Sequence, residues 1–315
     1  MTGEKHRHWR RFRPRPPRAP LRVSVVRYVN TAPLVWGLER GSQRTRYQLS
    51  YTVPAECAED LRCGRADIGI IPAIEYQTIP GLKIIPGIAI ASQMRVESVL
   101  LVSRGPARRA KRVALDSSSR TSAALVKILF ARQWGRAPTY VEAQPDLATM
   151  LDQADAALLI GDPALQFALH SPAASLGSAS LDVARDKRDR GTAGLAREGN
   201  WHVYDLGEEW WRLTRLPFVY AFWAVRAEKL RASRFAARAL TRAFQESRDF
   251  GLAHLGEIAR AAAAELELPG GQLERYLRHS IDFRLDAPHR AGVECFYRYA
   301  RDVGLLEELK PLEFL

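Results

Sequence analysis

The sequence predicts an α/β protein of two lobes, each built on a mostly parallel sheet. Two observations support this fold class. Short runs rich in valine and isoleucine end in turn or capping residues at four places, and a helical pattern follows each run. Two longer apolar runs of strand-forming residues, 98–103 and 218–225, bracket a region that has strand–helix repeats of its own. We therefore expect the chain to leave a first lobe, build a second and return, with the two crossing runs forming a two-strand hinge.

The first two junctions lie near the start of the chain. A strand is expected at residues 22–28, and Asn30 or Thr31 caps the helix that follows, with a proline in its first turn. The run 67–71 repeats the arrangement, with Pro72 at the start of the next helix. Both assignments follow from apolar runs that stop at residues typical of helix beginnings.

The other two junctions lie between the crossing runs. The strand 112–115 leads through the polar stretch 116–119 into a helix, and the strand 156–160 leads through Gly161 and Asp162 into another. Ligands of open α/β sheets bind in the crevice at the carboxyl ends of the strands. The four junctions are therefore where we expect the chemistry to lie.

The crossing runs also set the predicted domain boundaries. Lobe 1 comprises residues 21–100 plus 219–315, and lobe 2 comprises residues 101–218. Near the end of the chain, apolar residues recur at helical spacing over 255–266 and again over 293–303. We place these C-terminal helices on lobe 1.

The chain carries a formal net charge of +12, and half of it lies in a short tail. Residues 1–20 hold seven basic side chains against Glu4, together with four prolines and few large apolar groups. Such a segment cannot bury enough apolar surface to fold, so we expect it to be disordered and outside the chemistry. The remaining charge is too weak to predict a nucleic-acid partner.

Composition indicates a cytoplasmic, reduced protein with no membrane partner. The tail has no apolar run of the secretory type, and no later stretch approaches the ~18 uninterrupted apolar residues of a membrane-spanning helix. The three cysteines have no metal-ligand or disulfide spacing. Nucleotide, zinc and nucleophile-elbow motifs are missing too, so the sequence predicts no cofactor and no metal.

The densest group of polar residues is the stretch Asp116-Ser-Ser-Ser-Arg-Thr-Ser122. A helix N-terminus with hydroxyl groups and a guanidinium favours a bound carboxylate or phosphate. The alternative is that Ser118 or Ser119 only caps the helix and that Arg120 points to solvent. Capping alone would also explain Asn30-Thr31 and Asp162. A group of aromatic residues between 201 and 223 is more typical of core or domain interface than of a base-stacking surface.

Several segments resemble chorismate dehydratase, an enzyme family of the futalosine route to menaquinone. They are YVNTAPL (28–34), LRCGRADIGIIPAIEY (61–76), SVLLVS (98–103), LDSSSRTSAAL (115–125), LIGDPAL (159–165) and YDLGEEWWRLTRLPFVYAFWAV (204–225). The resemblance runs from about residue 21 to 315 and excludes the tail. It implies the type II periplasmic-binding-protein fold in a cytoplasmic enzyme. The implied reaction removes water from chorismate, a dicarboxylate, without a cofactor, because formation of the aromatic ring drives it.

The resemblance also implies roles for the residues at the junctions. Asn30 and Ser98 would be catalytic, hydrogen-bonding the ring substituents and assisting loss of hydroxide. The implied substrate-binding residues are Thr31, Ser119, Arg120, Thr121, Ser122, Gly161 and Asp162. The proton acceptor stays open between the substrate's own enolpyruvyl carboxylate, which we favour, and Asp162, Asp116 or Glu97.

Three rival functions remain. The nearest is the sibling enzyme that forms 1,4-dihydroxy-6-naphthoate from cyclic dehypoxanthine futalosine and shares the implied fold. The second is a non-catalytic binding protein for a small carboxylate. The third, a nucleic-acid binder, rests on charge alone. The sequence does not predict the oligomeric state.

Overall fold

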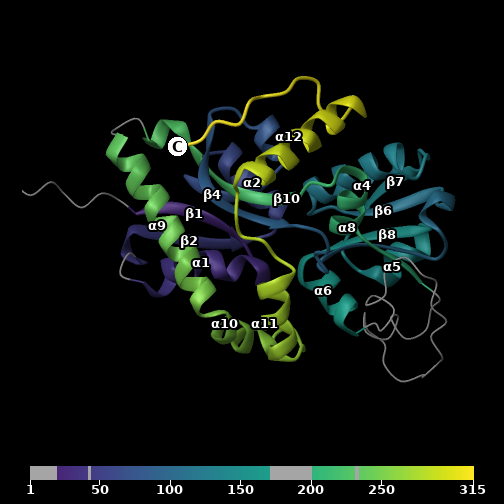
Figure 1. Cartoon of the computed structure of the whole chain (residues 1–315), viewed down its shortest axis with the longest axis horizontal. Coiled ribbons are helices and arrows are strands. Elements are labelled where there is room, and N and C mark those ends of the chain that lie inside the picture. Colours follow the sequence, from purple (N-terminus) through teal and green to yellow (C-terminus); the bar gives the residue numbers. More distant parts are fainter. Residues whose placement is uncertain (1–19, 42–43, 171–200, 231–233) are drawn as a thin grey trace, which may run out of the picture.

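The computed structural model contains two five-stranded sheets that lie side by side (Figure 1). It describes residues 20–41, 44–170, 201–230 and 234–315. The prediction of a disordered tail therefore lies outside the described residues, apart from Pro20. The α/β class and the two-lobed arrangement predicted from the sequence are confirmed.

The first sheet has the strand order β2-β1-β3-β10-β4. Its strands are β1 (Leu21–Val26), β2 (Tyr47–Thr52), β3 (Ile68–Pro72), β4 (Leu82–Ser92) and β10 (Phe218–Arg226). β1 pairs in parallel with β2 and β3, whereas β10 is antiparallel to both β3 and β4. Strand β10, which comes late in the sequence, thus lies between β3 and β4, which come early in it. The first lobe is therefore built from N-terminal and C-terminal parts of the described chain.

The second sheet has the order β7-β6-β8-β5-β9 and repeats this arrangement. Its strands are β5 (Val99–Ser103), β6 (Arg112–Asp116), β7 (Thr139–Ala143), β8 (Ala156–Ile160) and β9 (His202–Asp205). β6 pairs in parallel with β7 and β8, and β5 is antiparallel to β8 and β9. The two predicted crossing runs, β5 and β10, are therefore equivalent antiparallel strands, one in each sheet.

Two short connections join the lobes. Residues 93–98 lead from β4 to β5, and residues 215–217 lead from α8 (Leu206–Thr214) back to β10. Both connections lie outside the strands themselves.

Helices cover both sheets and extend across the junction between them (Figure 1). In addition to α8 they are α1 (Ala32–Arg40), α2 (Pro54–Arg62), α3 (Glu75–Thr78), α4 (Arg120–Arg132), α5 (Leu147–Gln153), α6 (Gly161–His170), α9 (Arg234–Ala253), α10 (Leu255–Ala263), α11 (Gly270–His279) and α12 (Ala287–Asp302). α9 packs on α1 and β4 of the first lobe, as expected for a C-terminal helix. α12 packs on β10 and also on α4 of the second lobe, where Arg132 pairs with Asp302. Helix α12 therefore contacts both lobes, and Arg132 of α4 also lies over the ring of Tyr299 in α12.

Local predictions at the helix beginnings were less accurate. Pro72 is the last residue of β3 and opens no helix, because it pairs with Ala221 of β10. Thr31 occupies the position before α1, but neither Thr31 nor Asn30 forms a capping hydrogen bond through its side chain. Ser119 likewise precedes α4 without capping it. These polar side chains are therefore available for other contacts.

Five of the eight aromatic residues between 201 and 223 that were expected in the core or at an interface are buried, and the other three, Trp201, Tyr204 and Trp211, are half-buried. Trp210 of α8 is fully buried, and its ring lies 5.2 Å from that of Phe218 and 6.3 Å from that of Phe296 of α12. This cluster brings together α8, β10 and α12 beside the connection 215–217. None of the described helices is both long and apolar enough to cross a membrane.

A buried histidine joins α12 to the other connection between the lobes. His289 Nε2 lies 3.2 Å from Asp282 Oδ2, and His289 Nδ1 lies 2.6 Å from Asp286 Oδ1. Gln93 donates to Asp282 Oδ2, and Arg284 pairs with both aspartates. Burial lowers the pKa of His289, but the hydrogen bonds to the two carboxylates outweigh burial and raise it above its ordinary value. The two carboxylates therefore stabilise the protonated form of His289.

Replacing His289 with glutamine is expected to lower the free energy of unfolding by about 1–3 kcal/mol at about pH 6, because the carboxylates of Asp282 and Asp286 lose their buried, charged partner. The difference from wild type should shrink as the pH rises. A group whose pKa is raised on folding adds stability that is complete below its unfolded pKa of about 6.5 and is lost as the pH rises through the folded value. Urea unfolding of both proteins between about pH 5.5 and 9 measures this difference. The exposed His279→Gln variant serves as the control, and a loss at His289 that did not vary with pH would contradict the prediction.

Candidate functional site

A cavity lies between the two sheets at the carboxyl ends of their strands. Every predicted junction contributes to it: the segments after β1, β6 and β8, and Pro72 at the end of β3. The connection 93–98 and strand β10 complete the lining. The parallel strands of each sheet end at this face, which is why residues far apart in the sequence meet here.

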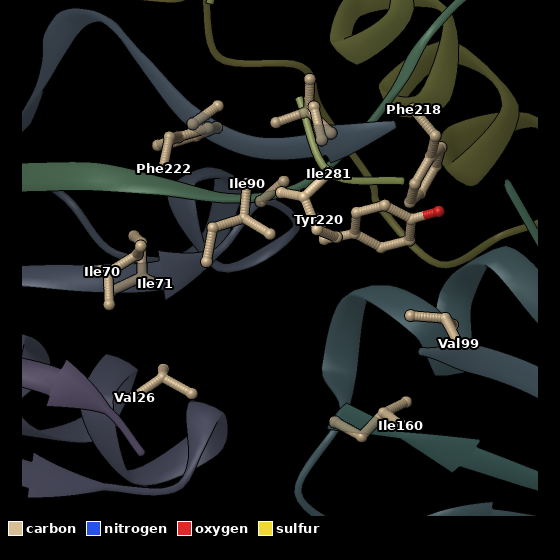
Figure 2. Close-up of a cluster of buried hydrophobic side chains, with 14 of the residues drawn as sticks. Val26, Ile70, Ile71, Ile90, Val99, Ile160, Phe218, Tyr220, Phe222 and Ile281 are labelled. Atoms are coloured by element: carbon tan, nitrogen blue, oxygen red, sulfur yellow. The ribbon is translucent and has the colours of Figure 1, made fainter. Parts of the chain in front are cut away.

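Apolar side chains form the broad walls of the cavity. Val26, Ile90 and Tyr220 come from the first sheet, and Val99 and Ile160 from the second. Figure 2 shows Val26 on one side of the gap, with Val99 and Ile160 on the other. Walls of this kind exclude water from the faces of a ring-sized ligand.

Asn30 and Ser98, the two predicted catalytic residues, both line this cavity and meet at one hydroxyl group. The amide nitrogen of Asn30 donates to the hydroxyl of Tyr276, at 3.3 Å, and the Tyr276 hydroxyl donates to Ser98 Oγ, at 2.8 Å. Thr31 Oγ1 in turn donates to Asn30 Oδ1 at 3.4 Å. Sequence reasoning missed Tyr276, because its spacing from neighbouring leucines in α11 is that of a core residue.

The backbone before Ser98 is held in a strained turn. Glu97 has φ 63°, in the left-handed region that a residue with a side chain rarely adopts. Asp205 accepts hydrogen bonds from the backbone N–H groups of Val96, at 3.0 Å, and Glu97, at 2.7 Å. Burial raises the pKa of Asp205 to about 6, although these hydrogen bonds oppose the shift. Asp205 thus holds the connection that presents Ser98 to the cavity.

The N-terminal turn of α4 supplies the most polar wall. Ser119, Thr121 and Ser122 line the cavity here, and the first N–H groups of a helix have no partner within it. In the described part of the chain, neither Ser119 nor Ser122 forms a hydrogen bond through its side chain, whereas Ser118 donates to Asp116 Oδ1 at 2.7 Å. The sequence placed a cap or an anion site at this position, and the structure has no side-chain cap here.

Arg120, the predicted cation, lines the cavity and pairs across it with the other lobe. Its Nη1 lies 3.2 Å from Oε1 of Glu75, whose carboxylate is buried and also pairs with Arg62 at 2.6 Å. Next to it, Thr121 Oγ1 accepts a hydrogen bond from the backbone N–H of Ile74. These contacts join the lobes in a closed arrangement. No role for Glu75 was predicted from the sequence, although this residue lies in the segment 61–76 that carries the resemblance.

Gly161 forms the contact between the lobes at the opposite wall. Its φ is +62°, and a Cβ at this position would lie 2.6 Å from three ring atoms of Tyr28. Tyr28 lines the first cavity and also a second one. Its ring therefore separates the two cavities, and only glycine permits the ring to pack so closely.

Two predicted substrate-binding residues, Thr31 and Asp162, line the second cavity and not the first. Asp162 Oδ1 accepts the backbone N–H of Val29 at 3.0 Å. Burial raises the pKa of Asp162 to about 6, against the effect of this hydrogen bond. A residue's place at the end of a strand is predictable from sequence, but the side on which its side chain points depends on packing.

The three protein carboxylates considered as proton acceptors lie away from the first cavity. Besides Asp162, Asp116 is buried and accepts from Ser118, and burial raises its pKa. The Glu97 carboxylate accepts two hydrogen bonds from Arg275 and one from Ser280. Among the described residues that line the first cavity, Arg120 is the only charged one. Within the same described ranges, no group of three or more potential metal-ligating side chains is present.

Comparison with known proteins gives a family and a fold. A family model described as "Menaquinone biosynthesis" matches residues 21–182 and 193–302. A chorismate dehydratase of Thermus thermophilus is 31% identical over 278 residues, which cover 88% of this chain and 94% of the relative.

Two solved structures show the fold alone. One, from Archaeoglobus fulgidus, has a TM-score of 0.68 and 16% identity, and the match covers 91% of this chain and 99% of that one. The periplasmic aliphatic sulphonate binding protein SsuA of Escherichia coli has a TM-score of 0.59 and 15% identity, over 95% of this chain and 94% of its own. The fold is therefore of the type II periplasmic-binding-protein kind. Together with the family model and the sequence match, this shows that the chain belongs to the menaquinone biosynthesis family.

Proposed function

We propose that the protein is a chorismate dehydratase that needs no cofactor. In this reaction the C–H bond at ring carbon 3 breaks, its electron pair forms the new ring double bond, and the hydroxyl at carbon 4 leaves. The products are 3-[(1-carboxyvinyl)oxy]benzoate and water. The observation that carries the proposal is an apolar cavity between the lobes with Asn30, Ser98 and the N-terminus of α4 in its walls, in a chain that is 31% identical to a chorismate dehydratase.

One carboxylate of the substrate binds at the N-terminal turn of α4. The free hydroxyl groups of Ser119 and Ser122 and the first N–H groups of the helix donate to it. Arg120 contributes positive charge, which its ion pair with Glu75 at 3.2 Å partly neutralises. This arrangement favours a carboxylate that is held in place but can still be released with the product.

The elimination takes place near Asn30 and Ser98. In this proposal the Ser98 hydroxyl donates to the departing hydroxyl group at carbon 4, and Asn30 orients the enolpyruvyl carboxylate over the hydrogen at carbon 3. Closure of the lobes through Arg120–Glu75 and Tyr28–Gly161 excludes water and holds the reacting groups in line.

The substrate's own enolpyruvyl carboxylate is the proposed proton acceptor, and it passes the proton from carbon 3 to the departing hydroxide, which leaves as water. Asp116, Glu97 and Asp162 are each engaged in other hydrogen bonds, and none of the described residues lining the cavity is acidic. A carboxylate that arrives with the substrate supplies the base that this cavity lacks. The step would belong at the start of a futalosine-type route to menaquinone.

Incubation of the purified protein with chorismate is expected to give 3-[(1-carboxyvinyl)oxy]benzoate in equal amount to the chorismate consumed, without added metal or cofactor. Absorbance of the new aromatic ring, with chromatographic identification of the product, follows the reaction. Binding of chorismate without turnover would favour the binding-protein alternative. Turnover of cyclic dehypoxanthine futalosine in place of chorismate would favour the sibling enzyme.

A further inference from the structure

Tyr276 lies behind the cavity wall and contacts both proposed catalytic side chains. It belongs to α11, far from both Asn30 and Ser98 in sequence, and its side chain is fully buried. It is not among the residues that line the cavity. Its hydrogen bonds therefore reach the cavity through the side chains of Asn30 and Ser98.

The hydrogen bonds of Tyr276 determine where the protons of its partners point. A phenol has one proton, which Tyr276 donates to Ser98 Oγ at 2.8 Å. The oxygen of Tyr276 accepts from the amide nitrogen of Asn30 at 3.3 Å. Since Ser98 Oγ accepts from Tyr276, the proton of Ser98 must point away from Tyr276. Since the nitrogen of Asn30 faces Tyr276, the orientation of the amide is fixed as well.

We propose that Tyr276 is a positioning residue that turns the Ser98 proton and the Asn30 amide toward the substrate. This inference deepens the proposed function and rests on it. Without the phenol hydroxyl, Ser98 could donate its proton to Asn30 or to water as readily as to the leaving hydroxyl group. Asn30 could also rotate its amide by half a turn, which would exchange its donor and acceptor groups.

Two features keep Tyr276 in this role. Burial raises the pKa of Tyr276 well above its ordinary value, so that the hydroxyl keeps the proton it donates. The preceding residue, Arg275, forms two hydrogen bonds to Glu97, at 3.1 and 2.7 Å, and Ser280 donates to the same carboxylate. Helix α11 is thus attached at both sides of Tyr276 to the residue that precedes Ser98.

Replacing Tyr276 with phenylalanine removes one oxygen atom and leaves the ring in place. We expect kcat for chorismate to fall about tenfold or more, while KM and the affinity for the product change by less than about twofold. Tyr76→Phe is the matched control. Tyr76 is also fully buried, and its hydroxyl also donates one hydrogen bond, to the Pro311 carbonyl, and accepts one, from the Glu313 N–H group. This control is expected to keep the wild-type kcat.

The same substitution in a Ser98→Ala background separates positioning from a structural role. If Tyr276 acts through Ser98, Tyr276→Phe should lower single-turnover rates much less in that background than in wild type. An equal fall in both backgrounds, an equal fall in Tyr76→Phe, or an unchanged kcat in Tyr276→Phe would overturn the inference while the proposed function stands. A wild-type protein inactive on chorismate would overturn the proposed function itself, and the assigned role of Tyr276 with it.

Discussion

The Asn30→Ala variant is expected to lose about 10²-fold or more of kcat on chorismate, the size of loss that follows when a reacting group is misplaced by about 1 Å. In the proposed mechanism Asn30 holds the enolpyruvyl carboxylate over the hydrogen that it removes. Alanine takes away the donor and also leaves the Tyr276 hydroxyl without the bond from the Asn30 amide. Steady-state kinetics with chorismate, with chromatographic detection of the product, measures the effect.

Product binding and the free energy of unfolding are the controls for Asn30→Ala. Both should remain close enough to wild type to show a folded cavity. The near-isosteric Asn30→Asp variant tests the same contact by electrostatic repulsion. Its negative charge would face the substrate carboxylate, which should raise KM and also lower kcat. Full turnover by Asn30→Ala would eliminate Asn30 from the mechanism.

The Gly161→Ala variant is expected to lower kcat/KM by about 10²-fold, because it prevents the close approach between the lobes on which orientation depends. Gly161 has φ +62°, and its new Cβ would lie 2.6 Å from Tyr28 ring atoms. Tyr28 would have to move, and with it the wall between the two cavities. The rate of product formation at low chorismate concentration measures kcat/KM directly.

The control variant Gly135→Ala separates the steric clash with Tyr28 from the cost of placing alanine at a positive φ. Gly135 has φ +63°, but no atom lies within 4 Å of the position of its Cβ. It should therefore show only the backbone cost, about 1–2 kcal/mol of stability, with normal kcat/KM. If Gly161→Ala retained as much kcat/KM as Gly135→Ala, closure at Tyr28 would not be needed for the reaction.

The repeating elements of the fold could be read from the sequence because their signals are local. The short apolar runs at 112–115 and 156–160 correspond to β6 and β8, and the apolar spacing over 293–303 corresponds to α12. Strand and helix periodicities depend on residues that are close together in the sequence, so they can be recognised without knowledge of the tertiary contacts. The helix beginnings were less predictable. Thr31 and Ser119 have the residue types of caps, yet neither caps its helix.

The candidate site, too, was predicted only in part from the sequence. Asn30, Ser98, Ser119 and Ser122 do line one cavity. Asp162 lines the cavity behind Tyr28, although it follows β8 directly, because its carboxylate accepts the N–H of a residue from the other lobe. A sequence places a residue at a strand end, but the direction of its side chain depends on partners that are far away in the chain.

The sequence alone therefore determined the α/β class, the two lobes and the strand ends at which polar residues gather. The tertiary structure alone decided the partners: Glu75 for Arg120, Tyr28 for Gly161 and Tyr276 for both Asn30 and Ser98. The physical reason is that these two kinds of information depend on residues at different separations in the sequence. Backbone propensity and apolar periodicity act over a few residues, whereas a hydrogen bond or ion pair between lobes forms only when packing brings distant segments into contact.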